Sequence, residues 1–144
     1  IGDYKRKGGV GPHRWELLMN TQRVWFAFFT VLALTLNFGF FVGEIDNPDH
    51  HNLYEFFFAL IVSLIATILK IGDRSHLGAV LLATSLVADL QLIAAAVIWG
   101  YGSQVTGHVS GSVMASIVSL AGGAMLANVT SVILLIAETI QLKR

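Results

Sequence analysis

Cysteine is absent from this 144-residue chain, and charged residues make up only 12% of it. Without cysteine there is no disulfide, no thiolate nucleophile and no cysteine-bound zinc or iron–sulfur centre. Soluble domains carry roughly 25% charged residues, so the low charge predicts a protein that lies in the lipid bilayer. Nine Lys and Arg balance nine Asp and Glu, and this neutral balance gives no reason to expect a nucleic-acid partner.

Recognisable catalytic motifs are also missing from the sequence. It contains no glycine-rich phosphate loop, no nucleophile elbow and no H-E-x-x-H zinc helix. We therefore expect that the protein is not an enzyme and that it binds no organic cofactor.

Four long apolar runs occupy most of the chain, at residues 24–42, 53–69, 77–99 and 113–142. A helix over the first run reaches about 28 Å, close to the hydrocarbon thickness of a bilayer. We predict an all-α membrane protein with four transmembrane helices in one domain, residues 19–144. Residues 1–18 are polar, begin with Ile and precede Met19. We interpret them as a leader of vector-derived or alternative origin.

All lysines and arginines fall before the first run, between the second and third, or after the fourth. With four spans these three places lie on one side of the membrane, and the positive-inside rule makes that side cytoplasmic. We therefore expect both termini in the cytoplasm, with residues 43–52 and 101–112 facing outward.

The first run carries polar residues every seven positions, at Arg23, Thr30, Asn37 and Glu44. A helix drifts by only about 20° per heptad, so these four residues share one face. An amide in hydrocarbon needs a partner, and this face should therefore meet protein or water. It serves either in helix packing or as a water-lined path. In a path, Thr30 and Asn37 would be polar steps, and the flanking Leu34 and Phe41 an apolar constriction.

Asp89 lies near the middle of the third run. A charged aspartate at that depth costs about 2.5–3.5 kcal/mol. Candidate partners are Asn37, Asn128, serine or threonine hydroxyls, backbone groups, water or a bound cation. Two interpretations stay open: a neutral residue that joins helices, and an ion or proton site.

Further acids gather between the first two runs, at Glu44, Asp46 and Asp49, beside His50 and His51. Carboxylates suit divalent cations, and copies around an axis would turn each acid into a ring. An ordinary hydrated loop is the alternative. The candidate metal-binding residues are thus Glu44, Asp46, Asp49 and Asp89.

Small residues line one side of the fourth run and let helices approach closely, within the chain or between subunits. They are Ser112, Ser116, Ser119, Gly123, Ala127 and Ser131.

The stretches MNTQRVWFAFFTVLALTLNFGFFVGEIDNPDHHNLYEFF and LLATSLVADLQLIAAAVIWGY resemble a family of small, functionally unassigned bacterial inner-membrane proteins. That resemblance implies a bacterial inner membrane and four helices, without an activity. In architecture alone the chain is similar to Orai-type calcium channels, whose first helix is basic inside and ends outside in a glutamate.

We predict a homo-oligomeric cation channel, with a divalent ion such as calcium as a candidate. The alternatives are a non-conducting accessory or scaffold subunit of a larger membrane complex, and a proton-coupled carrier that uses Asp89.

Overall fold

The computed structural model describes the backbone of residues 12–142 and the side chains of residues 20–141. The described backbone forms four α-helices and a short 3-10 helix: α1 (Pro12–Phe41), η2 (Pro48–His50), α2 (Leu53–Lys70), α3 (His76–Gln104) and α4 (Gly111–Leu142). The predicted all-α fold is confirmed for this part of the chain. Of the predicted leader, residues 1–11 lie outside the described residues, and α1 begins at Pro12.

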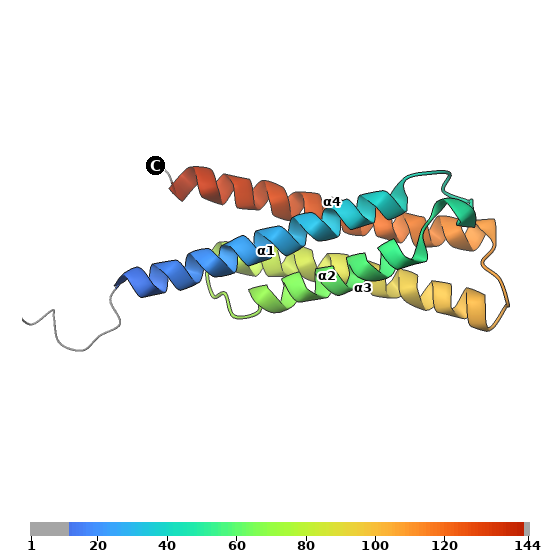
Figure 1. The fold of residues 1–144 in the computed structure, drawn as a ribbon, viewed down its shortest axis with the longest axis horizontal. Coiled ribbons are helices and arrows are strands. Elements are labelled where there is room, and N and C mark those ends of the chain that lie inside the picture. The colour runs from blue at the N-terminus through green and yellow to red at the C-terminus, as the bar shows by residue number, and fades with distance from the viewer. Residues whose placement is uncertain (1–11, 143–144) are drawn as a thin grey trace, which may run out of the picture.

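The four helices run along one long axis and alternate in direction (Figure 1). The most extensive contacts are those of α3 with α4 and of α1 with α2, followed by those of α1 with α4. The seam between α2 and α3 is the least extensive of the four. This seam holds the buried Asp89.

Local hydrogen bonds fix where the helices begin and end. Gly43 follows α1 with a φ of +119°, a conformation that glycine adopts without strain. The side chain of Asn52 caps α2 by accepting from the N–H groups of Tyr54 and Glu55, and the hydroxyl of Ser75 caps α3. The helices therefore stop where the sequence supplies turn and cap residues.

Each helix contains a segment long and apolar enough to cross a membrane: Asn20–Phe41, Leu53–Lys70, His76–Gln104 and Gly111–Gln141. The predicted four spans are thus confirmed. The third is longer than the run at residues 77–99, because the Val105 N–H still donates to the Tyr101 carbonyl at 2.9 Å. The connection to α4 shortens accordingly to residues 105–110.

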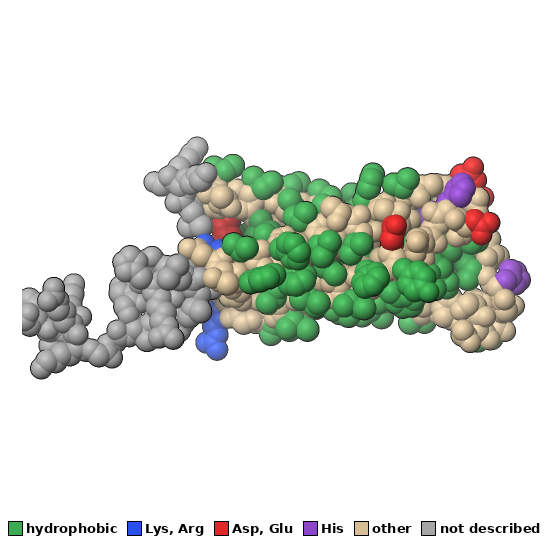
Figure 2. Space-filling view, viewed as in Figure 1, with side chains coloured by type: hydrophobic (Ala, Val, Ile, Leu, Met, Phe, Trp, Pro, Cys, Tyr) green, Lys and Arg blue, Asp and Glu red, His purple; other side chains and the backbone are tan. Residues whose placement is uncertain are grey.

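Charged side chains separate toward the two ends of the bundle. Figure 2 shows hydrophobic side chains along its length, Lys and Arg at one end, and most of the visible acids and histidines toward the other. We call the end that holds Arg23, Lys70 and Arg74 the basic end, and the end that holds residues 43–52 the acidic end. At the basic end, Arg23 of α1 pairs with Glu138 of α4 at 3.2 Å.

Candidate functional site: a polar layer inside the bundle

Two apolar clusters fill the interior toward the two ends. Phe40, Phe56, Leu92 and Met114 belong to the cluster nearer the acidic end, where the rings of Phe40 and Phe56 lie 5.1 Å apart. A smaller cluster nearer the basic end contains Phe26, Ala66 and Leu81. Each apolar cluster separates the middle of the bundle from one end.

Buried polar side chains lie between or beside these clusters on every helix, and we call this set the polar layer. On α1, for example, it falls between Phe26 and Phe40. The layer consists of Thr30, Asn37, Ser63, Thr67, Ser85, Asp89, Asn128 and Ser131. Its position along the helices places it at hydrocarbon depth, where hydrogen bonds from water are scarce.

Asp89 is the acidic residue of the polar layer, and α2 supplies its partners. Only 5% of Asp89 is exposed. The Ser63 hydroxyl donates to Oδ1 at 2.7 Å, and the Thr67 hydroxyl contacts Oδ2. Thr67 also lies 3.1 Å from the Ser63 carbonyl oxygen. The Thr67 hydroxyl thus has two acceptors within reach, Oδ2 of Asp89 and the Ser63 carbonyl, and three-centre hydrogen bonds of this kind are common in helices.

A groove of about 570 Å³ opens over this site along the seam between α2 and α3. Asp89 and Thr67 contribute its polar atoms, while its remaining walls are aliphatic: Leu64, Ile68, Leu86, Leu90 and Ile93. The aspartate therefore lies just beneath the outer surface of the bundle.

The stripe predicted on the first span divides in the structure. Thr30 is 2% exposed and Asn37 is fully buried, so both face the bundle interior. Glu44 is exposed beyond the end of α1, and Arg23 forms an ion pair with Glu138. Leu34 and Phe41 are partly buried, and Phe41 packs against Gly122. In this packing only the middle of the stripe, Thr30 and Asn37, faces the other helices of its own chain.

Several buried polar atoms have no hydrogen-bond partner among the described residues. They come from all four helices: Thr30 Oγ1, both side-chain polar atoms of Asn37, Glu55 Oε2, Gln91 Oε1 and Asn128 Nδ2. Each such atom in a membrane interior costs several kcal/mol unless water or another polar group satisfies it. These buried atoms therefore need hydrogen-bond partners that the described residues do not supply.

The small residues predicted on one side of α4, from Ser112 to Ser131, form a line that lies in two different environments. Its inner part packs on α3, where Ser131 and Thr84 share a 2.6 Å hydrogen bond and Gln91 lies against Gly123. Its other part, Ser112, Ser116 and Ser119, is exposed. Close packing within the chain therefore uses only part of this line.

The acids predicted to bind metal at the acidic end remain apart within one chain. Glu44, Asp46 and Asp49 are exposed, and no three His, Cys, Asp or Glu side chains among the described residues form a metal-binding group. The ring nitrogens of His51 lie 2.5 Å from the Phe40 carbonyl and 2.8 Å from that of Glu44. Both nitrogens are thereby occupied in holding the loop.

Sequence reasoning identified Asp89 but did not single out Ser63 and Thr67 as its partners. A signal was present, because these are the only serine and threonine residues in the second apolar run. They are four positions apart and therefore lie on one helix face. Their contact with Asp89 depends on how α2 and α3 pack, which residue spacing within α2 does not determine.

The fold and the polar layer define a four-helix membrane protein with a carboxyl group at mid-span. The chain belongs to a family of unknown function, DUF6394, whose family model matches residues 50–139. This match includes Ser63, Thr67 and Asp89, and the predicted resemblance to a functionally unassigned family is confirmed. Neither a curated protein nor a solved structure matches the chain.

Proposed function

We propose that the protein is a homo-oligomeric cation channel of the bacterial inner membrane, in which Asp89 is the charged group that meets the ion. The observation that carries this proposal is the polar layer, which holds unpartnered atoms and a carboxyl group between two apolar clusters. A helix bundle that only needed to pack in lipid would be more stable with apolar residues at these positions.

The charges of the layer and of the acidic end both favour cations. Among the described buried residues of the polar layer, Asp89 alone is ionisable. Glu44, Asp46 and Asp49 are exposed at the acidic end, and exposed acids raise the local concentration of cations. The two apolar clusters would act as gates that close this conformation to ions.

One carboxylate with two hydroxyl partners matches a singly charged cation, including a proton, better than a divalent one. Calcium takes six to eight oxygen ligands, usually with several carboxylates. We therefore expect a singly charged cation at Asp89, and a divalent ion only where Glu44, Asp46 and Asp49 of several copies converge. That arrangement would be the ring of acids expected from the sequence.

The proposed oligomer uses the exposed part of the small-residue line on α4. Ser112, Ser116 and Ser119 would let a second copy approach closely. The basic end faces the cytoplasm in this proposal, following the positive-inside rule.

Flux measurements in liposomes test the proposal. The protein is reconstituted, and uptake of potassium, sodium, protons and calcium is followed separately. We expect uptake of at least one of these ions in the wild type and its loss in Asp89→Asn. Thr35→Val is the matched control, because its exposed hydroxyl bonds only the Leu32 carbonyl of its own helix; its uptake should equal that of the wild type. Equal uptake in the wild type and Asp89→Asn would contradict the proposal.

A non-conducting accessory subunit is the second candidate, because two hydroxyls already satisfy both oxygens of Asp89. Because this sequence contains no cysteine, disulfide formation at one introduced cysteine can distinguish a homo-oligomer from an accessory subunit. In membranes, Ser116→Cys should form a disulfide-linked dimer of this chain if it is a homo-oligomer. A stoichiometric foreign subunit that co-purifies in mild detergent, without such dimers, would favour the accessory role.

A further inference from the structure

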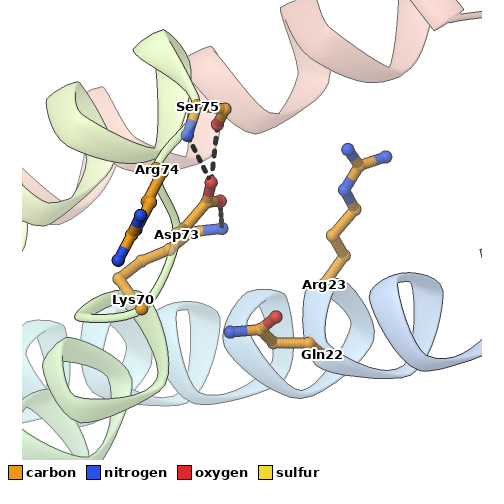
Figure 3. A pocket seen from close by; sticks show the side chains of 7 residues that line it. Gln22, Arg23, Lys70, Asp73, Arg74 and Ser75 are labelled. Carbon is orange, nitrogen blue, oxygen red and sulfur yellow. Dashed lines mark hydrogen bonds and ion pairs between the residues drawn. The ribbon is translucent and has the colours of Figure 1, made fainter. Parts of the chain in front are cut away.

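A small cavity at the basic end lies apart from the polar layer. Its volume is about 230 Å³, and it lies between α1 and the turn that joins α2 to α3 (Figure 3). Its walls are formed by Gln22, Arg23, Lys70, Gly72, Asp73, Arg74 and Ser75. The second span ends at Lys70 and the third begins at His76, so the cavity lies at the depth of lipid headgroups.

Three cationic side chains line this cavity against one acid. Lys70 is nearly buried and pairs with Asp73 at 3.2 Å, and Arg23 pairs with Glu138 at 3.2 Å. Arg74 is exposed and has no ion-pair partner among the side chains at residues 20–141. The cavity with its paired acids therefore retains one net positive charge.

The contacts of Lys70 and Asp73 hold the cavity in shape without a ligand. The Lys70 ammonium lies 4.5 Å from the centre of the Phe26 ring, and Asp73 Oδ1 accepts from the N–H and the hydroxyl of Ser75. On the α1 side, the Gln22 side chain donates to the Leu69 carbonyl at 2.6 Å. Among the side chains that the structure describes, none forms an ion pair with the guanidinium of Arg74, which has five donors.

The geometry points to a binding site for a phosphate group, presented by the phosphodiester of an anionic phospholipid. Arginine binds phosphate oxygens with paired hydrogen bonds, and basic pockets between membrane helices suit anionic headgroups. The single net charge matches a phosphodiester, which carries one negative charge. The cavity volume of about 230 Å³ is below the roughly 300–1,000 Å³ typical of pockets for larger ligands, so the cavity suits a small group such as a phosphate. This inference is independent of cation conduction.

Binding is measured by native mass spectrometry and by the melting temperature of the protein in detergent. The probes are phosphatidylglycerol, phosphatidylcholine with the same acyl chains, sn-glycerol-3-phosphate and inorganic phosphate. We expect phosphatidylglycerol to bind and to raise the melting temperature more than phosphatidylcholine. Arg74→Gln should weaken phosphatidylglycerol binding about ten-fold, the loss expected for a hydrogen bond to a charged group.

Two controls keep the outcome clear. Arg74→Lys should retain part of the binding, and Thr35→Val, whose hydroxyl bonds only the Leu32 carbonyl of its own helix, should bind like the wild type. The lipid-free melting temperature of Arg74→Gln should equal that of the wild type, because Arg74 is exposed. Unchanged phosphatidylglycerol binding in Arg74→Gln would overturn the site. Stabilisation by inorganic phosphate without any by phosphatidylglycerol would overturn its assignment to a lipid.

Discussion

Removing the hydroxyl partners of Asp89 should destabilise the protein more than neutralising Asp89 itself. In Ser63→Ala/Thr67→Val, both carboxyl oxygens lose the contacts that α2 provides. Hydrogen bonds between membrane helices contribute about 0.6–2 kcal/mol each, so two of them give about 1–4 kcal/mol. The aspartate would then lie at hydrocarbon depth without its partners, a position that insertion scales penalise by about 2.5–3.5 kcal/mol.

Asp89→Asn preserves this arrangement. The amide oxygen can accept from Ser63, and the amide N–H can donate to the Thr67 hydroxyl. Thr67 then donates to the Ser63 carbonyl, 3.1 Å away. We expect a loss below about 1 kcal/mol, within the range of one such hydrogen bond. Asp89→Leu added to Ser63→Ala/Thr67→Val should restore stability, because it removes the unpaired acid.

The free energy of unfolding in mixed detergent micelles measures these differences across the variants. The order of stability should be wild type, Asp89→Asn and then Ser63→Ala/Thr67→Val, with the triple variant above the double. If Asp89→Asn were less stable than Ser63→Ala/Thr67→Val, the two hydroxyls would not be the principal partners of Asp89, and this reasoning would fail.

Three further predictions concern topology, pH and packing. In intact cells, a membrane-impermeant maleimide should label His108→Cys but not Gly72→Cys; the reverse pattern would invert the proposed orientation. Burial raises the pKa of Asp73, but hydrogen bonds from Ser75 and Lys70 outweigh it and leave that pKa below its usual value. The stabilisation from Asp73 is therefore complete above the unfolded pKa of about 3.9 and disappears as pH falls through the lowered folded value. In Asp73→Asn the melting temperature should no longer show this part of its decrease at low pH. The same dependence of melting temperature on pH in the variant and the wild type would contradict the prediction. A Cβ at Gly78 would lie 2.2 Å from Asp73 Cγ, whereas one at Gly100 would meet nothing within 4 Å. Gly78→Ala should thus lower the free energy of unfolding by about 1–3 kcal/mol, while Gly100→Ala should raise it by up to about 1 kcal/mol. The melting temperatures of the two variants measure this difference, and equal effects would refute the predicted clash.

The helices were predictable because residue type alone determines whether a segment is stable in lipid. Long uncharged runs identify the spans, and residues such as Asn52 and Ser75 mark their starts by capping. The end of α3 was less predictable, since the apolar run ends at residue 99 whereas the helix continues through Gly100 and Gly102 to Gln104. Inside a membrane protein, backbone hydrogen bonding outweighs the weak helix propensity of glycine.

The candidate site was only partly predictable, for a geometric reason. Asp89, Thr30 and Asn37 are conspicuous because polar groups at these depths are costly. Which helix supplies the partners of Asp89 depends on the packing of α2 against α3, and a periodicity within one helix does not encode it. Closeness in sequence was also misleading at the acidic end, where Glu44, Asp46 and Asp49 are near neighbours but do not form a metal-binding group among the described residues.

The most direct test of cation conduction is the reversal potential of the purified protein in a planar bilayer under a salt gradient. We predict a current in the wild type that reverses near the equilibrium potential of the cation, and no current above background in Asp89→Asn. A current that reverses near the equilibrium potential of the anion, or one that is the same in both proteins, would contradict the proposed role of Asp89.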